Sequence, residues 1–260
     1  MMFMEERQAD IVKRVNETGR IMVSEIQQIY NVSSDCARRD LRFLEGKGLL
    51  QRTHGGAISI AKAGTYPKKM YNPKDVEEIK KDYFTVAKKA LEYIRNDEVI
   101  YITTSLVGYY MAMNLPEDLA VTVLTNSVTI AEVLRKKENV SVILLGGLMS
   151  NRGNCHDFYT IQMVNNIRID KAFMSHNALS IEYGATTHDS SGMEFGRAVM
   201  RNSRVKIGLY PSSKIGKESI HSVCPLDAYD LIITDSNVPE LFVNQIAEKD
   251  VEIEVVPLME

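Results

Sequence analysis

Arginine is concentrated in one short stretch of the chain, where Arg38, Arg39 and Arg42 fall close together. A guanidinium carries its N–H donors in a planar fork that can bond a guanine edge or a phosphate with two hydrogen bonds. The segment 38–74 holds nine Lys or Arg against two carboxylates, a local charge of +7. Because the whole chain carries −3, the remainder carries about −10. Positive charge gathered in this way is typical of contact with nucleic-acid phosphates.

Helices are needed to hold these arginines on a surface. The apolar spacing over 5–18 predicts a first helix, and Ser24 with Gln27 three residues later predicts a capped second helix. Ser33 is placed to cap a third helix that runs to about Glu45 and carries the arginines.

A glycine-tipped hairpin is expected after the third helix. The runs 49–53 and 57–60 flank His54-Gly55-Gly56, where glycine tolerates the positive φ of a tight turn. Short helices followed by such a hairpin are typical of a winged helix-turn-helix domain. In such a domain, the second helix of the helix-turn-helix motif enters the major groove of DNA. We therefore predict a winged helix-turn-helix domain at 1–60 that binds double-stranded DNA. The residues predicted to contact DNA are Ser33, Ser34, Arg38, Arg39, Arg42, Arg52 and His54.

An alternative interpretation places the arginines in a salt-bridged helix face. Arg39 and Asp35 are four residues apart, a spacing at which helical side chains pair, and Asp40 adjoins the two arginines. The turn, the caps and the Gly-Gly hairpin together favour DNA binding. The sequence does not decide which arginine contacts bases.

Beyond residue 60 the pattern changes twice. The segment 61–75 contains Gly64, Pro67 and Pro73 with few large apolar residues, which predicts a linker. From 76 to 260, helical stretches alternate with short aliphatic runs, which predicts an α/β, Rossmann-like domain with a mostly parallel sheet and helices on both faces. Helices are expected near 76–94, 106–114, 127–137, 156–166, 193–202 and 239–248. Strands are expected near 98–103, 120–125, 140–145, 169–175, 205–210, 230–234 and 251–256.

The chain resembles a known family. From Arg7 to Ile58 it is similar, almost without gaps, to the DNA-binding module of DeoR-family transcriptional regulators, on the run Y-N-V-S-S-D-C-A-R-R-D-L-R-F-L-E-G-K-G-L-L-Q-R-T-H-G-G-A. One departure is Cys36, where the family usually has a threonine hydroxyl. The resemblance continues more weakly from Val76 to Pro257. It implies a sensor and oligomerisation domain at 76–260, with a sugar-phosphate-isomerase-like fold that binds phosphorylated sugars or related metabolites.

Polar residues follow several predicted strands, at the edge where parallel sheets bind ligands. Asn126 and Ser127 can bond a sugar or phosphate oxygen, Gly146-Gly147 permits close backbone approach, and Thr104-Ser105 could bind an anion at a helix N-terminus. Each also has a simpler explanation, as a helix cap, a turn or a solvated side chain. The predicted effector-binding residues are Thr104, Ser105, Asn126, Ser127, Gly146, Gly147, Asn177 and Lys214.

Several positions depart from the pattern that the resemblance implies. The family usually reads D-x-G-T-T where this chain has T-T-S-L-V at 103–107. Pro211 stands in place of an Asp, and the S-H-N-A of 175–178 lacks both glycines of the usual G-A-[DN]-G. Because the carboxylate that would accept sugar hydroxyls is missing, the sequence predicts a changed effector or a lost one.

The leading hypothesis is a DNA-binding regulator of carbohydrate genes, by resemblance a repressor, that acts as a homodimer or homotetramer under a small phosphorylated metabolite. One alternative is a ligand-independent oligomerisation domain. Another is an isomerase-like enzyme that uses His188, Asp189 or Glu194 as acid and base. The positions where the fold would offer Asp carry Thr103 and Pro211, so no catalytic residue is predicted.

The rest of the sequence indicates where the protein acts and whether it contacts a membrane or a metal. Charges in 1–10 argue against a signal peptide, and the apolar runs, such as 142–145, are too short to span a bilayer. Cys36, Cys155 and Cys224 are scattered, without the spacing of a zinc site or a disulfide framework. The sequence therefore predicts a cytoplasmic protein without membrane contact, metal or cofactor.

Overall fold

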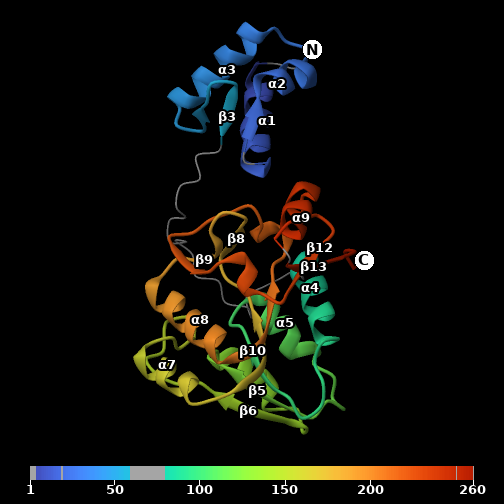
Figure 1. Ribbon diagram of the computed structural model, residues 1–260, viewed down its shortest axis with the longest axis vertical. Coiled ribbons are helices and arrows are strands. Elements are labelled where there is room, and N and C mark those ends of the chain that lie inside the picture. Colours follow the sequence, from blue (N-terminus) through green and yellow to red (C-terminus); the bar gives the residue numbers. More distant parts are fainter. Residues whose placement is uncertain (1–3, 19, 59–79, 250, 260) are drawn as a thin grey trace. The chain divides into compact units, whose positions relative to one another are not determined.

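The computed structural model describes residues 4–18, 20–58, 80–249 and 251–259. It divides into two compact units, Met1–Lys62 and Ala63–Glu260, which are drawn in Figure 1. The predicted linker at 61–75 lies outside the described residues, as do the first residues of the helix predicted from 76.

The N-terminal unit contains three helices and a small antiparallel sheet in the order β1-β3-β2. Its core is built from apolar residues of all three helices, including Ile11, Ile26 and Leu41, each at most 1% exposed. The elements are α1 (Met4–Thr18), β1 (Arg20–Met22), α2 (Val23–Tyr30), α3 (Ser34–Gly46), β2 (Gln51–Arg52) and β3 (Gly56–Ile58).

The caps of these helices confirm one prediction and correct another. Ser33 caps α3, since its Oγ accepts a hydrogen bond from the Cys36 backbone N at 3.2 Å. The predicted cap of α2 at Ser24 is wrong, because that helix begins at Val23 and its N-cap is Met22. Instead, the Glu25 carboxylate accepts a hydrogen bond from the Met22 backbone N at 2.6 Å, so a backbone N–H at the helix start that has no partner within the helix is satisfied.

The C-terminal unit is built on a seven-stranded parallel sheet in the order β13-β12-β10-β7-β4-β5-β6. The strands are β4 (Val99–Ile102), β5 (Val121–Thr125), β6 (Val140–Leu144), β7 (Ile169–Met174), β10 (Ser203–Leu209), β12 (Leu231–Asp235) and β13 (Glu252–Val256). All seven match strands predicted from short aliphatic runs, which confirms the parallel α/β fold.

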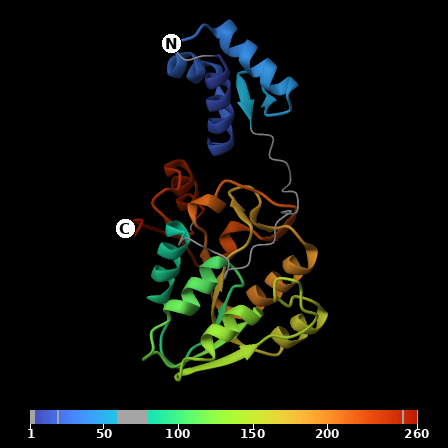
Figure 2. The ribbon, with the colours of Figure 1, turned by 180° about the vertical axis from the view of Figure 1, so that it is seen from behind.

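Helices cover both faces of this sheet, as predicted (Figures 1 and 2). They are α4 (Lys81–Leu91), α5 (Leu106–Asn114), α6 (Val128–Leu134), α7 (Phe158–Asn165), α8 (Ser190–Asn202) and α9 (Glu240–Ala247). Successive residues of one strand divide between two cores, because side chains alternate across a sheet. Phe173 packs with residues of α4, α5 and α6, whereas Ala172 and Met174 pack with residues of α7, α8 and α9.

A second, three-stranded antiparallel sheet lies in the same unit and was not predicted. It has the order β11-β9-β8, from β8 (Ala178–Ser180), β9 (Gly184–Thr187) and β11 (His221–Cys224). Two short 3-10 turns, η2 (Ser212–Lys214) and η3 (Leu226–Ala228), flank β11 in the sequence. The helix predicted from 193 begins at Ser190 instead, because Asp189 caps it with a 2.6 Å hydrogen bond from the Gly192 backbone N.

Candidate functional sites

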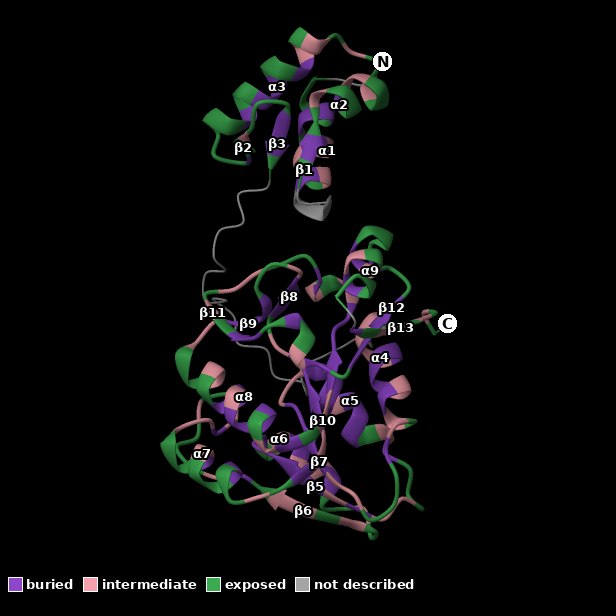
Figure 3. Ribbon diagram, in the orientation of Figure 1, coloured by how far each residue is buried: buried purple, intermediate pink, exposed green. Residues whose placement is uncertain are grey.

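The arginines of α3 form an exposed cationic face. Arg38, Arg39 and Arg42 are all exposed, whereas Leu41 and Leu44 of the same helix are buried in the core. Figure 3 shows both exposed and buried stretches along α3. Within the part of the chain that the structure describes, no ion pair engages any of these three guanidiniums, and Asp35 forms none with Arg39. A salt-bridged helix face is therefore not what the structure shows at this surface.

Asp40 points the other way, into the N-terminal unit. Its carboxylate accepts hydrogen bonds from Arg7 Nε at 2.7 Å and from Gln8 Nε2 at 2.8 Å, and all three residues are buried. The bond to Asp40 raises the pKa of the Arg7 guanidinium. Arg7 also donates to Cys36 Sγ at 3.6 Å, so the residue that replaces the family threonine packs against α1. These contacts fix the orientation of α3 on α1.

The hairpin places its two predicted DNA contacts differently. His54 is exposed at the tip, but Arg52 is half-buried and its Nη1 lies 3.6 Å from Glu45 Oε2. Gly56 packs so closely on β1 that a Cβ there would overlap the Ile21 backbone oxygen. Ser34 is half-buried at the first position of α3, beside the exposed cap residue Ser33. The predicted DNA-contact residues thus lie along α3 and on the hairpin, and Ser34 and Arg52 among them are half-buried.

A cleft of about 720 Å³ lies at the carboxyl edge of the parallel sheet. The chain order of the strands reverses between β4 and β7, since β5 and β6 lie on one side of this pair and β10, β12 and β13 on the other. Ligands of open parallel sheets bind at such a switch point. The loops after β4, β5, β6, β7 and β10 all contribute residues to the cleft.

Six of the eight predicted effector-binding residues line this cleft: Thr104, Ser105, Asn126, Ser127, Asn177 and Lys214. Gly146 and Gly147 are not among the lining residues. Gly147 has a φ of +151° and abuts α7, where a Cβ would overlap Asp157 Oδ1. Asp157 also accepts the Leu148 backbone N at 2.9 Å, so the two glycines turn the chain toward α7.

Lys214 is held at the end of β7. Its Nζ donates to Ser175 Oγ at 2.8 Å and to the His176 backbone oxygen at 2.9 Å, and it lies 5.5 Å from the centre of the Tyr83 ring. Burial lowers the pKa of Lys214 to about 8, with a partly opposing effect of the Asp82 carboxylate. An ammonium has three N–H donors, so one remains for a bound anion.

The N-terminus of α5 opens into the same part of the cleft. Ser105 caps this helix by accepting the Gly108 backbone N at 3.3 Å, and Thr104 precedes it, both half-buried. Gly108 lies so close to the loop that a Cβ would overlap the Thr103 backbone oxygen. Thr103 Oγ1 donates to the Ser175 backbone oxygen at 3.3 Å and joins the loops on both sides of the switch point.

The amide side chains in the cleft are largely engaged by the protein. Asn126 Oδ1 accepts from Tyr101 OH at 2.9 Å, and its Nδ2 donates to the Cys155 backbone oxygen at 2.6 Å. Ser127 caps α6 through the Ile130 backbone N at 3.4 Å. Asn177 Oδ1 accepts from Thr187 Oγ1 and from the backbone N of residue 188, at 2.9 and 3.2 Å. These residues shape the cleft and leave fewer atoms for a ligand.

Sequence reasoning missed the contribution of the loop 148–157. This loop follows β6 but folds back over the end of β5, where Asn154 pairs with Ser127 and the Cys155 backbone N donates to the Asn126 backbone oxygen at 3.0 Å. It thereby brings Arg152 and His156 to the cleft. The only sequence signal for this site is a polar N-R-G-N run after a predicted strand.

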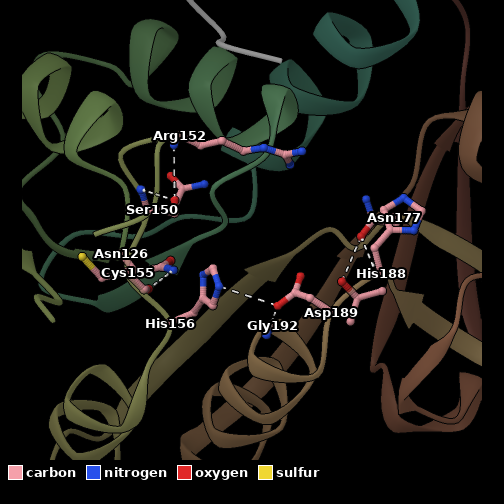
Figure 4. A network of polar contacts seen from close by, with 11 residues as sticks. Asn126, Ser150, Arg152, Cys155, His156, Asn177, His188, Asp189 and Gly192 are labelled. Atoms are coloured by element: carbon pink, nitrogen blue, oxygen red, sulfur yellow. Dashed lines mark hydrogen bonds and ion pairs between the residues drawn. The ribbon is translucent and has the colours of Figure 1, made fainter. Parts of the chain in front are cut away.

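Asp189 and His188 also line the cleft, and Asp189 lies next to His156 of this loop (Figure 4). Asp189 Oδ1 lies 3.6 Å from His156 Nε2 and also accepts the α8 cap bond. His188 Nδ1 lies 2.7 Å from Ser219 Oγ. Asp189 is the one carboxylate among the described residues that line the cleft. Glu194 lies outside that set and faces Arg197 Nη1 at 3.4 Å.

Family comparisons agree with both units. Residues 7–63 match the DeoR-like helix-turn-helix domain, and residues 80–236 match the DeoR C-terminal sensor domain. The chain belongs to the DeoR family of transcriptional regulators. Within the DeoR family, it is 30% identical over 260 residues to the HTH-type transcriptional repressor GlcR of Bacillus subtilis, covering 97% of this chain and 96% of the relative.

Two further proteins are similar to this DeoR-family chain. It is 30% identical over 235 residues to a lactose phosphotransferase system repressor of Staphylococcus epidermidis, covering 89% of this chain and 92% of the relative. A D-ribose-5-phosphate isomerase structure matches 53% of this chain and 55% of its own, at 14% identity and a TM-score of 0.40. Among the described residues, the structure holds no helix that is both long and apolar enough to cross a membrane.

The positions that depart from the DeoR pattern have structural partners. Pro211 precedes η2, and the buried Asp235 at the end of β12 supplies a carboxylate there, accepting the Ser212 backbone N at 2.6 Å and its Oγ at 2.8 Å. His176 Nδ1 lies 3.0 Å from Tyr210 OH and 3.2 Å from Tyr229 OH. Burial, with the Lys214 charge, lowers the pKa of His176 to about 3, so this imidazole is neutral at pH 7.

Proposed function

We propose that this DeoR-family regulator binds a double-stranded operator through α3 and the hairpin and represses carbohydrate genes until a small phosphorylated metabolite occupies its sensor cleft. The observation that carries the DNA-binding part is the exposed face of Arg38, Arg39 and Arg42, held outward by the buried Asp40 contact. Repression and carbohydrate control are supported by the names of the relatives, which include a lactose phosphotransferase system repressor.

The proposed DNA contacts divide by chemistry. Ser33 and Ser34 at the start of α3 would bond a phosphate through the helix N-terminus. Arg38, Arg39 and Arg42 would contact base edges or phosphates in the major groove. Exposed His54 and the half-buried Arg52 would reach the backbone beside that groove.

The sensing part rests on the cleft at the switch point of the sheet. Lys214 and the N-terminus of α5 with Thr104 and Ser105 would hold a phosphate, because a cation and unpaired helix N–H groups both favour an anion. Asn126, Ser127 and Asn177 would contact the sugar. Gly146 and Gly147, which do not line the cleft, are left out of this proposed site.

We further propose a homo-oligomer that acts in the cytoplasm. Two recognition helices related by a two-fold axis would contact two half-sites of an operator. Four apolar side chains expose between 58% and 79% of their surface: Leu148, Met149, Phe158 and Tyr159. The ring centres of Phe158 and Tyr159 lie 5.8 Å apart. In a homo-oligomer these exposed apolar side chains would pack against a second copy of the chain. Effector binding would regulate DNA affinity only by favouring one arrangement of the assembly, typically by about 1–3 kcal/mol.

Regulation rather than catalysis is the role we assign to the cleft. A general base must lie free near the substrate, whereas Asp189 is engaged as a helix cap and beside His156. The neutral, half-buried His176 is held by two tyrosine hydroxyls. Turnover of ribose 5-phosphate by the purified protein would contradict this assignment.

The test begins with a duplex selected from a random DNA pool by the full-length protein. Arg39→Gln is expected to weaken binding to that duplex by about 1–3 kcal/mol if the side chain contacts a base. If Arg38 or Arg42 contacts a phosphate, its Gln variant should lower the salt-dependence slope by about 1. Arg168→Gln, at an exposed arginine of the sensor unit, is the matched control. Unchanged affinity in all three α3 variants would overturn the docking.

The sensing role is tested by calorimetry with fructose 6-phosphate. Micromolar binding that Lys214→Met abolishes is expected, together with release of the selected duplex. Operator binding that no sugar phosphate changes would favour the alternative, a sensor domain that only oligomerises.

A further inference from the structure

We infer that the effector is anionic at both ends: a sugar bisphosphate or a phosphorylated sugar acid rather than a sugar monophosphate. This inference rests on the proposed sensing role of the cleft and specifies its ligand class. Lys214 with the N-terminus of α5 would hold one anionic group. Arg152 would hold the second.

The charge lining the cleft is the first support. Lys80, Arg152 and Lys214 face it, against the single carboxylate of Asp189 among the described lining residues. That carboxylate is already engaged with the α8 N-terminus and lies beside His156. A lining of this sign concentrates anions.

The cations occupy two separate places, which is the second support. Lys214 is bonded to the loop that follows β7, whereas the loop that carries Arg152 is bonded to residues that follow β5. In the sheet order, β4 separates β7 from β5. Adjacent strands lie 4.7–4.9 Å apart, so the two loops are anchored about 10 Å apart. This spacing suits the two ends of an extended pentose or hexose, not one phosphate.

The Arg152 guanidinium has no bonding partner among the described residues. It is exposed, and no ion pair or side-chain hydrogen bond engages its guanidinium in the part of the chain that is described. Figure 4 shows its side chain extending away from the loop that carries it, and Arg152 is among the residues that line the cleft. A guanidinium pairs with phosphate or carboxylate through two parallel hydrogen bonds, which neutral hydroxyls cannot match in strength.

Few polar side chains in the cleft have atoms left to bond the hydroxyl groups of a neutral sugar end. Thr103 Oγ1 is bonded to the Ser175 backbone oxygen, and the Asn126 amide is bonded within the protein on both atoms. The cleft therefore offers few carboxylate or amide oxygens to hydroxyl groups and offers cations at both ends. The lining therefore favours a ligand that carries an anionic group at each of these two ends.

The test compares matched ligands on the full-length protein by isothermal titration calorimetry. Fructose 1,6-bisphosphate is compared with fructose 6-phosphate, and 6-phosphogluconate with glucose 6-phosphate. We expect at least one doubly anionic ligand to bind tenfold or more tightly than its monophosphate partner, the effect of one charged hydrogen-bonded pair. The pair that shows the preference distinguishes a second phosphate from a carboxylate.

Arg152→Gln assigns that preference to the second anionic group. The variant should lose the tenfold preference while its affinity for the monophosphate stays within twofold, and Arg168→Gln should change neither. If Arg152→Gln lowers the melting temperature, Arg152→Lys, which retains the charge, is measured instead and should keep part of the preference.

The outcomes separate this inference from the proposed sensing role. Equal binding of the monophosphate and doubly anionic ligands, or equal weakening of both by Arg152→Gln, overturns the inference and leaves sugar-phosphate sensing intact. Absence of binding by all four ligands overturns both.

Discussion

Replacing Asp40 by alanine should abolish DNA binding although this side chain faces away from the proposed DNA surface. Asp40 joins α3 to α1 through Arg7 Nε at 2.7 Å and Gln8 Nε2 at 2.8 Å. The side chains of Arg7 and Asp40 are only 11% and 4% exposed. Removing one partner of a buried ion pair costs about 3–5 kcal/mol, because the other charge stays buried without compensation. At about 0.05–0.15 kcal/mol per residue, a unit of roughly 60 residues has about 3–9 kcal/mol in all.

Hydrogen exchange of the full-length protein, followed by mass spectrometry of its peptides, measures this loss. Peptides from α1 and α3 should exchange with an opening free energy lower by about 3–5 kcal/mol, while peptides from β4 and β5 stay unchanged. Glu45→Gln is the control, since the Glu45–Arg52 pair is partly exposed at 3.6 Å and such pairs contribute about 1 kcal/mol or less. Arg39→Gln should weaken DNA binding without altering exchange.

A double-mutant cycle isolates the pair itself. Arg7→Met and Asp40→Ala should each destabilise α1 and α3, and the double variant should cost at least about 2 kcal/mol less than the sum, because no buried charge is then left unpaired. Additive costs, or a cost of Asp40→Ala below about 1 kcal/mol, would refute the view that this buried contact holds the recognition helix in place.

Three further predictions concern the sensor unit. Because burial lowers the pKa of Lys214 to about 8, its charge is lost above that pH, so affinity for a sugar phosphate should fall between pH 7 and 9.5 in calorimetry. Lys214→Met should bind weakly at every pH in this range, and a pH dependence that survives this substitution would contradict the assignment. Gly108→Ala should lower the unfolding free energy by about 1–3 kcal/mol in urea titration, since a Cβ there would overlap the backbone of the preceding loop. Gly146→Ala, with no atom within 4 Å of a new Cβ, should cost much less; equal costs would refute the packing argument. Replacing both Phe158 and Tyr159 by serine should shift the assembly toward monomer in sedimentation equilibrium, and an unchanged mass would place the interface elsewhere.

Much of the fold follows from local patterns in the sequence. Each strand of the parallel sheet is a short aliphatic run between helical stretches, so its position can be predicted without knowing its neighbours. Six predicted effector residues reach one cleft because parallel strands bring the ends of distant segments to one edge. The exposed arginines of α3 follow from the same logic, since helical spacing separates them from Leu41 and Leu44.

The features that were not predicted, or were predicted wrongly, depend on contacts that local sequence patterns do not show. Short strands such as Ala178–Ser180 carry little periodicity, and their sheet depends on β11, more than thirty residues further along the chain. The cap of α2 was predicted at Ser24 but lies at Met22, whose backbone N donates a hydrogen bond to the Glu25 carboxylate. Gly147 was assigned to the ligand, but it contacts α7 through Asp157.

The amino-acid order alone therefore predicts a helix-turn-helix followed by a parallel α/β domain, since helices and buried strands are encoded in neighbouring residues, and its resemblance to the DeoR family implies a regulator. Folding in three dimensions is what turns Asp40 inward to Arg7, 33 positions away, and carries Arg152 back over β5 into the cleft. Such contacts depend on which surfaces meet after the chain has packed, and no local spacing of residues records that.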